Sequence, residues 1–246
     1  MDIALSKGLA ILDYIARAGG PVKLSAVAED LGLVKSGVHR VLTTLCELGF
    51  ATHEPETRRY QATLKTWELG ATIIAAHPVK RAAAPYMQEL HRTTGETVNL
   101  LVLDGDDVLF LDKILSPRPL RFTTQQGSRV PAPLTGSGLV MLGYEPGARA
   151  LVDRVIKVDG EAKHLDARKV MKDIALAKEQ GYATTQSRRT PGIMGIAAPV
   201  MGRNGRAAAA IAVSGPVERI GGKRKPEIID VVRSACVRIA ETAGRL

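Results

Sequence analysis

The hydrophobic and polar positions of the first fifty residues predict three short helices. Apolar side chains recur at helical spacing in three runs, over residues 7–18, 26–31 and 37–48, and each run ends at glycine. A serine precedes each run and is expected to cap its helix: Ser6, Ser25 and Ser36. The third helix has an apolar stripe that we expect to be buried, made of Val38, Val41, Leu42 and Leu45.

After Gly49 the pattern changes to one typical of a β-hairpin. Residues 50–53 and 59–62 are short β-compatible segments, and the turn-forming residues 54–58 lie between them. Three helices followed by a hairpin are typical of a winged helix-turn-helix, which we predict for residues 1–62.

A fourth helix is predicted over residues 64–76, and Pro78 ends it. Its apolar side chains, among them Trp67, cover more surface than a solvated linker needs. We therefore treat residues 63–78 as a linker helix that is buried against a partner.

Residues 79–246 have the pattern of a second domain of mixed helices and strands. Helices are expected over residues 80–94, 135–142, 147–157, 165–180 and 226–243. Strands are expected over residues 97–103, 108–114, 120–123, 196–201 and 207–213. The run Ala207–Ala210 favours a helix by propensity, but turn residues on both sides favour a strand. Hairpins rather than βαβ units predict an α+β fold with an antiparallel sheet and flanking helices.

Composition narrows the class of protein. Aromatic residues make up only 4% of the chain, which disfavours a protein that stacks single-stranded bases. The two cysteines lie far apart and form neither a metal-binding spacing nor a disulfide framework. The chain shows no secretory signal and no apolar run long enough to span a bilayer. We expect a cytoplasmic protein without a cofactor, a metal or a membrane partner.

The net charge of +9 hints at a nucleic-acid partner but does not locate its binding face. Residues 1–62 contain seven basic and seven acidic side chains, so the excess lies in residues 63–246. The local arrangement of charges must therefore identify any DNA-binding face.

The third predicted helix is the candidate for reading double-stranded DNA. No acidic residue lies between Asp30 and Glu47. If the apolar stripe is buried, the outward face carries Lys35, Ser36, His39, Arg40, Thr43 and Thr44. Arg40 is the best candidate to read a guanine, and Ser25, Arg58 and Arg59 are further candidate contacts. The alternative is a winged helix that binds protein.

A small-molecule pocket is predicted in the second domain. The glycines of Thr135–Gly138 would allow a ligand close to backbone N–H groups at a helix start. Residues 192–198 and 207–212 are rich in small side chains, and Ser214 could add a hydroxyl. These small residues would leave room for a ligand or, alternatively, allow tight packing of a helix on the sheet.

Catalytic motifs are lacking. The chain contains no nucleophile elbow, no His-Glu-x-x-His motif and no phosphate-binding loop, and its five histidines are scattered. We therefore do not expect an enzyme. A metabolite-converting enzyme with an appended winged helix, or a DNA-binding protein that needs no ligand, stays open as an alternative.

With these motifs in view, the chain resembles the IclR family of transcriptional regulators nearly end to end. The matching segments are Leu5–Leu12, Leu24–Gly49, Tyr60, Trp67–Gly70, Thr94–Leu100, Val102–Lys113, Gly181–Ala183, Ile196–Val200 and Ser214–Pro216. The resemblance implies a winged helix-turn-helix, a dimerising linker helix and a GAF-like effector domain. It also implies a dimer or tetramer that represses or activates a catabolic operon in response to a small metabolite, with an organic or aromatic acid as our expectation.

The resemblance also implies which residues bind the effector. The residues that match the family's pocket are Gly136, Ser137, Thr185, Gly195 and Ser214, and we add Leu120 and Phe122 to this site. The chain departs from the family at Gly138-Leu139, where a Gly-Lys pair is common, and at Gly195, where a larger polar residue is common. It also has Arg188-Arg189 where acidic residues are common, which favours an anionic ligand or a different interface.

Overall fold

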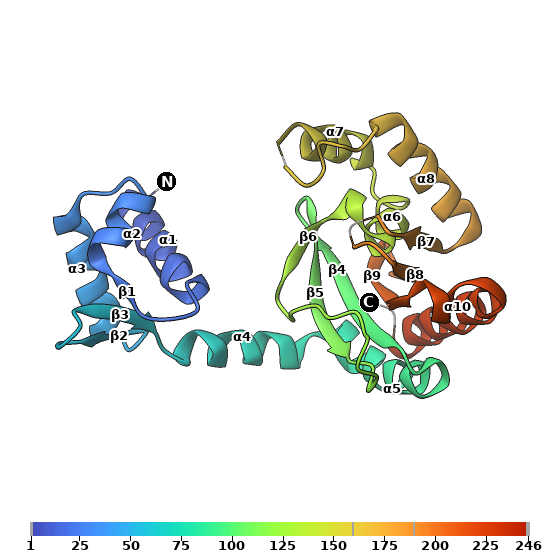
Figure 1. Ribbon diagram of the computed structural model, residues 1–246, viewed down its shortest axis with the longest axis horizontal. Helices are drawn as coiled ribbons and strands as arrows, with labels where there is room; N and C mark the ends of the chain where they lie inside the picture. Colours follow the sequence, from blue (N-terminus) through green and yellow to red (C-terminus); the bar gives the residue numbers. More distant parts are fainter. Residues whose placement is uncertain (1, 159, 189, 245–246) are drawn as a thin grey trace. The chain divides into compact units, whose positions relative to one another are not determined.

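Figure 1 shows the chain as a computed structural model, which describes residues 2–158, 160–188 and 190–244. The chain divides into two compact units, one ending at Ala75 and the other beginning at Ala76. Each unit has its own sheet and its own buried core.

The first unit is a winged helix. Its helices are α1 (Ile3–Arg17), α2 (Leu24–Asp30) and α3 (Lys35–Glu47). Its antiparallel sheet has the order β1–β3–β2, with β1 (Val22–Lys23), β2 (Ala51–Glu54) and β3 (Arg59–Ala62). The stripe predicted for α3 faces the core, with Val38, Leu42 and Leu45 buried and Val41 half-buried. The predicted order of three helices and a hairpin is confirmed, and β1 is an additional strand.

The three predicted serine caps are wrong. α1 begins before Ser6, at a turn where the carboxylate of Asp2 accepts hydrogen bonds from two backbone N–H groups at 2.8 and 3.1 Å. Ser25 and Ser36 lie inside the first turns of α2 and α3. Pairing with β3 holds Lys23 extended directly before α2, so this long-range contact fixes where the helix starts.

Helix α4 (Lys65–Ala76) has no buried residue. Its tryptophan, Trp67, is 68% exposed, and Leu64 and Ile73 are also exposed. The helix exists as predicted, and the partner expected to cover it stays a prediction.

The second unit contains a six-stranded antiparallel sheet in the order β6–β5–β4–β9–β8–β7. Its strands are β4 (Thr97–Asp104), β5 (Asp107–Ile114), β6 (Arg129–Pro131), β7 (Ala183–Gln186), β8 (Ile193–Met201) and β9 (Ala207–Pro216). The antiparallel sheet and the strand over Ala207–Ala210 are confirmed, because β9 pairs with both β4 and β8.

Helices cover both faces of this sheet (Figure 1). One face carries α6 (Gly136–Leu142), α7 (Ala148–Val158) and α8 (Ala167–Gln180), whose apolar side chains share a core with the sheet. The other face carries α5 (Pro78–Thr94) and α10 (Lys225–Thr242). Short helical turns complete the unit: η1 (Ala132–Leu134), α9 (Val217–Ile220) and η2 (Gly222–Arg224). None of the helices described has both the length and the hydropathy needed to cross a membrane.

The strand predicted over residues 120–123 is wrong. These residues lie in an irregular segment between β5 and β6, and β6 instead pairs with β5 further along the chain. Pro117 and Pro119 precede the predicted strand, and each lacks the N–H that a strand ladder needs. We call residues 115–128 the pocket loop.

Candidate DNA-binding face and ligand pocket

The polar face of α3 is exposed, as the sequence predicts. All six predicted residues are exposed while the apolar stripe is buried: Lys35, Ser36, His39, Arg40, Thr43 and Thr44. The hydroxyls of Thr43 and Thr44 donate to the backbone carbonyls of His39 and Arg40 at 3.0 and 3.1 Å. Their protons are therefore engaged within the helix, and their oxygens are left to accept.

The remaining DNA-contact candidates differ in whether other residues already engage their side chains. Ser25 is exposed on α2. Arg58 lies at the turn of the wing with φ 52° and makes no hydrogen bond or ion pair to any described residue. Arg59 donates from Nη1 to the carbonyl of Pro21 at 3.0 Å, which fastens the wing to the strand before α2. Arg58 is thus the more available of the two arginines.

An apolar groove borders the same face. It has a volume of about 550 Å³ and lies between α1 and α3. Leu5, Leu9 and Leu48 line it and are all more than half exposed. Arg40 and Thr44, from the polar face, form part of its wall.

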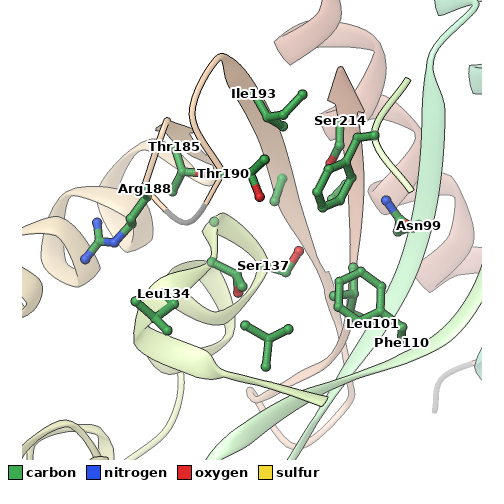
Figure 2. Close-up of a pocket in the computed structure, with 16 residues that line it drawn as sticks. Asn99, Leu101, Phe110, Leu134, Ser137, Thr185, Arg188, Thr190, Ile193 and Ser214 are labelled. Atoms are coloured by element: carbon green, nitrogen blue, oxygen red, sulfur yellow. The ribbon is translucent and has the colours of Figure 1, made fainter. Parts of the chain in front are cut away.

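The second unit contains a small pocket, shown in Figure 2, between the sheet, the pocket loop and α6. Its volume is about 80 Å³. Five residues that the sequence assigned to the effector site line it: Phe122, Gly136, Ser137, Thr185 and Ser214. Leu120 and Gly195 are not among the lining residues. The side chain of Leu120 is 68% exposed, because the pocket loop turns it outward.

Strand register brings three of the assigned residues into one row. Gly195 of β8 lies between Thr185 of β7 and Ser214 of β9. A Cβ on Gly195 would lie 3.2 Å from Oγ1 of Thr185 and 3.8 Å from Oγ of Ser214. Gly195 therefore keeps the space between the two hydroxyls open.

The small residues serve both packing and the pocket. Ala197 and Ala212 line the pocket and also belong to the core shared with α6. A Cβ on Gly136 would lie 3.6 Å from Cβ of Ala197, so α6 approaches the sheet closely there. Gly138 is not among the described residues that line the pocket, and packing requires a glycine there, because its Cβ would lie 1.9 Å from the carbonyl oxygen of Ala132.

Among the described residues that line the pocket, Arg188 is the only basic one and none is acidic. Its Nη1 donates to Oδ2 of Asp173 at 2.8 Å, and Figure 2 shows the guanidinium directed away from the pocket. Its Nε is buried and has no partner among the described residues. Arg189, its neighbour in the sequence, lies outside the described residues.

Sequence reasoning missed several residues of the pocket wall. Most are apolar side chains contributed by strands and by residues near α6: Leu101, Phe110, Val130, Leu134 and Ile193. The polar residue that it missed on β4 is Asn99, and Thr190 is another. An asparagine in the middle of the apolar run Val98–Val102 is the one sequence signal that could have pointed to the site.

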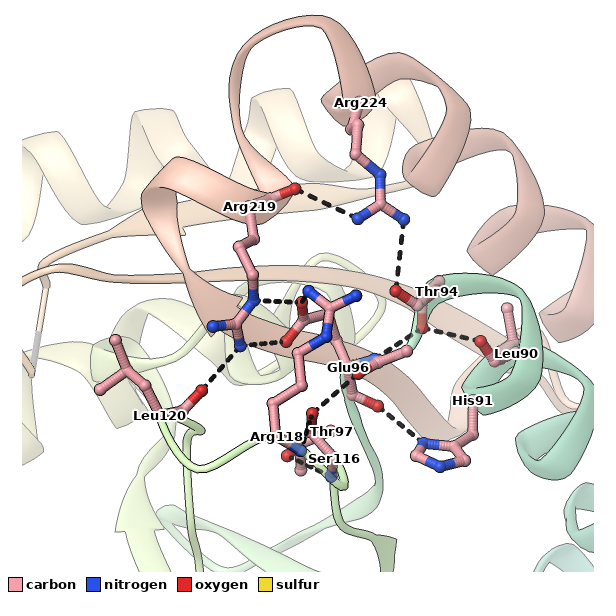
Figure 3. A network of polar contacts seen from close by, with 11 residues as sticks. Leu90, His91, Thr94, Glu96, Thr97, Ser116, Arg118, Leu120, Arg219 and Arg224 are labelled. Carbon is pink, nitrogen blue, oxygen red and sulfur yellow. Dashed lines mark hydrogen bonds and ion pairs between the residues drawn. The ribbon is translucent and has the colours of Figure 1, made fainter.

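A buried carboxylate fastens the pocket loop (Figure 3). Both oxygens of Glu96 accept from the Arg219 guanidinium, at 2.6 and 2.7 Å, and Arg118 of the loop lies 3.4 Å from Oε1. Arg219 also donates to the carbonyl of Leu120 at 2.8 Å, and its pKa is raised above the usual range by the hydrogen bonds to Glu96. The backbone of Leu120 thus takes part in holding the loop although its side chain does not reach the pocket.

The loop is also held next to the pocket itself. Oγ1 of Thr97 donates to the carbonyl of Phe122 at 2.9 Å, and Oγ1 of Thr124 donates to Oδ1 of Asn99 at 3.1 Å. No group of three His, Cys, Asp or Glu side chains in the described ranges could hold a metal ion.

A winged helix with an exposed polar helix face, followed by a sheet domain with a small pocket, defines the class of ligand-sensing transcriptional regulators. The IclR helix-turn-helix domain matches residues 4–55, and the bacterial transcriptional regulator IclR C-terminal domain matches residues 71–241. The chain belongs to the IclR family of transcriptional regulators. It is a DNA-binding regulator with a ligand-binding domain rather than an enzyme.

Three relatives illustrate the similarity. The chain is 32% identical over 235 residues to the HTH-type transcriptional regulator BhcR of Paracoccus denitrificans, covering 94% of this chain and 84% of that one. It is 30% identical over 252 residues to the glycerol operon regulatory protein of Streptomyces coelicolor, covering 98% and 96%. A crystal structure of a putative IclR regulator from Silicibacter sp. TM1040 superposes with a TM-score of 0.82 at 25% identity, covering 99% and 97%.

Proposed function

We propose that this regulator binds DNA as a dimer, with α3 of each copy in the major groove, and represses or activates a catabolic operon. A short organic acid in the pocket of the second unit controls the binding. The observation that carries the proposal is the exposed, acid-free polar face of α3 above a buried apolar stripe.

Arg40 is the residue we assign to base reading. It is exposed in the middle of the polar face, and its guanidinium makes no hydrogen bond or ion pair with other described residues. A bidentate contact from arginine to guanine discriminates against a wrong base by roughly 1–3 kcal/mol. Arg58, on the wing, would contact phosphate instead, which adds affinity without sequence preference.

Two unpartnered apolar surfaces support a dimer. Helix α4 exposes Trp67 and Ile73, and the groove between α1 and α3 exposes Leu5 and Leu9. Exposed apolar patches of this extent mark interaction surfaces in proteins. A twofold dimer of winged helices would read half-sites centred about one helical turn, ~34–36 Å, apart. The same measurement of mass in solution shows whether two dimers pair into a tetramer.

The pocket's size and charge support a short acid as the effector. The described lining includes one basic residue, Arg188, and no acid. The guanidinium of Arg188 is paired with Asp173 and directed away from the pocket (Figure 2), but its buried Nε has no partner among the described residues and can donate to an anionic ligand. The volume of about 80 Å³ is smaller than the cavity of about 150 Å³ that holds benzene in an engineered protein. The sequence leads us to expect an organic acid, aromatic or not, and the small volume leads us to favour a short aliphatic one.

The names of relatives support control of a catabolic operon. One relative is named the glycerol operon regulatory protein, and another, 26% identical, is named the transcriptional repressor IclR of Escherichia coli. These names describe those proteins. For this chain they support regulation of an operon for the use of a carbon source.

The test starts from selection of duplex DNA by the purified protein, with fragments that flank its own gene as the first probes. Arg40→Ala should lose discrimination at one base pair of the half-site. Arg58→Ala is the matched control: it should weaken binding to all sequences and flatten the dependence of affinity on salt. The mass of the protein in solution and on DNA measures the dimer.

Three results would count against the proposal. Unchanged sequence preference in Arg40→Ala would mean that α3 does not read bases through this residue. Failure to select any duplex would favour a winged helix that binds protein. Selection of DNA without any thermal shift from organic acids would favour a ligand-independent regulator, since a ligand at 100 times its Kd stabilises by about 2.7 kcal/mol.

A further inference from the structure

Asn99 has a buried hydrogen-bond donor that the fold leaves without a partner. We propose that its Nδ2 donates to a second oxygen of the effector, so that the effector is a short acid carrying a hydroxyl or carbonyl oxygen besides its carboxylate. This inference rests on the proposed binding of an acid in the same pocket, and it assigns Asn99 as the residue that selects among such acids.

The amide is buried but only half satisfied. The side chain of Asn99 is 1% exposed on β4 and lines the pocket. Its Oδ1 accepts from Thr124, whereas Nδ2 has no hydrogen-bond partner among the described residues. Buried amide groups in proteins are nearly always paired, because an unpaired one loses its bonds to water. A site that is completed by a ligand explains why this donor has been left open.

The sheet places this donor on the floor of the pocket. Asn99 pairs with Ala212 of β9, which pairs with Ala197 of β8. Both neighbours in this row are alanines that line the pocket, so no side chain of the row reaches across to satisfy Nδ2. The row lies two residues from the one that holds Ser214 and Gly195, and therefore on the same face of the sheet.

The loop contact explains only one end of the amide. Thr124 belongs to the pocket loop, and its bond to Oδ1 fixes how the amide is turned. A role limited to holding the loop would need an acceptor alone, which the hydroxyl of a serine or threonine supplies without an amide N–H. The N–H that points into the pocket is therefore the feature that needs a ligand.

The pocket's cation lies at a different place from this donor. Figure 2 shows Arg188 and Asn99 on opposite sides of the pocket, with Ser137 and Thr190 between them. The Nε of Arg188 is the other buried lining donor without a partner among the described residues. We place the effector's carboxylate on the Arg188 side and its second oxygen at Asn99.

The experiment compares acids of one length that differ only in the second oxygen. The probes are propionate, lactate, pyruvate and glycerate, and butyrate with its β- and γ-hydroxy derivatives, each titrated calorimetrically into the full-length protein. We expect the tightest oxygen-bearing acid to bind about tenfold or more better than the plain acid of the same length. Asn99→Leu, which removes the amide at similar volume, should bring this ratio close to one.

Two further variants separate ligand contact from a structural role. Asn99→Asp keeps an acceptor for Thr124 but sets a carboxylate against the acid, so binding of all the acids should fall at least tenfold. Thr124→Val removes the loop contact and leaves the N–H, so the preference should persist. The thermal midpoint of the ligand-free Asn99→Leu protein should fall no more than that of Thr124→Val, because both variants lose the loop contact and only Asn99→Leu also removes an unpaired buried donor.

The results test this inference separately from the proposed binding of an acid, on which it rests. Wild-type protein that binds plain and oxygen-bearing acids equally would overturn the role of Asn99 while leaving an acid effector in place. A preference that survives Asn99→Leu, or that Thr124→Val abolishes to the same extent, would also overturn it. Binding that Asn99→Asp retains would mean that the free end of the amide accepts rather than donates, and refutes the assignment. Absence of binding by every acid refutes both the acid effector and this inference.

Discussion

The ion pair between Glu96 and Arg219 predicts that its two partners are unequally costly to remove. The carboxylate of Glu96 is fully buried, whereas the side chain of Arg219 is 22% exposed. Arg219→Met therefore leaves the buried carboxylate of Glu96 with one ion pair, the 3.4 Å contact with Arg118. Removing one partner of a buried pair typically costs 3–5 kcal/mol. We expect about 3 kcal/mol here, because Arg118 compensates in part.

Glu96→Gln is the matched variant and should cost less. The glutamine keeps an acceptor for Arg219 at the same volume, and the partly exposed guanidinium can bind water. We expect about 1.5–2 kcal/mol, the lower part of the range of about 1.5–3 kcal/mol that a hydrogen bond to a charged group contributes. The double variant should lower the free energy of unfolding less than Arg219→Met alone, because it leaves no buried carboxylate without its partner.

Urea unfolding with hydrogen exchange of peptides from β4 and β9 measures this difference, since these strands report on the second unit alone. Arg219→Met should also speed exchange in the pocket loop, because it loses the bond to the carbonyl of Leu120. Glu96→Gln should leave that bond in place. A larger cost for Glu96→Gln than for Arg219→Met would refute the reasoning that the buried carboxylate dominates the pair.

Three further predictions concern other parts of the chain. Gly138→Ala should destabilise the second unit by about 3 kcal/mol in urea unfolding, because the new Cβ would overlap the backbone of Ala132 at 1.9 Å. Burial raises the pKa of the Cys236 thiol to about 12; only about one molecule in ten thousand is then the thiolate at pH 8, so a disulfide-exchange reagent should label Cys236 only after unfolding. The Arg154 guanidinium holds the pKa of Asp106 below its usual range by hydrogen bonding. This pair should stabilise the protein at neutral pH and lose its effect as the pH falls from about 4 through the lowered pKa of Asp106. The difference in unfolding midpoint between wild type and Asp106→Asn should therefore shrink on acidification.

Each of these has a result that would contradict it. An unchanged midpoint for Gly138→Ala would mean that α6 can move away from Ala132 without cost. Rapid labelling of Cys236 in the folded protein would mean that α10 opens readily from the sheet. A constant difference between wild type and Asp106→Asn down to acidic pH would mean that the ion pair contributes nothing to stability.

The elements with one strongly apolar face could be predicted from sequence, because burial of that face fixes the element. The stripe of Val38 and Leu42 placed α3 correctly, and the turns between hairpin strands gave the pairing of β4 with β5 and of β8 with β9. Helix starts were less predictable, because they depend on contacts with distant residues. The carboxylate of Asp2 caps α1 in place of Ser6, and β3 fixes the start of α2.

The pocket shows where local patterns stop being informative. The segment around Leu120 has strand-like side chains, but three long-range bonds hold its backbone in an irregular loop, from Arg219, Thr97 and Lys113. The pattern of residues within the segment does not predict those partners. The same limit explains why Leu120 lies outside the pocket lining whereas Phe122, two residues further along, belongs to it.

Asn99 could not be assigned from its own strand, since its meaning depends on what lies beside it in the sheet. Within β4 it is one polar residue among apolar ones, which is equally typical of a buried structural amide. The strand register places alanines beside Asn99 in the neighbouring strands. The hydroxyl of Thr124 in the pocket loop donates to Oδ1 of Asn99, but no described residue accepts from its Nδ2. The donor is left open by the combined positions of three strands and a loop that are far apart in sequence. A small residue that lines such a pocket can be recognised from composition, whereas an unpaired donor becomes visible only when every neighbour has been placed.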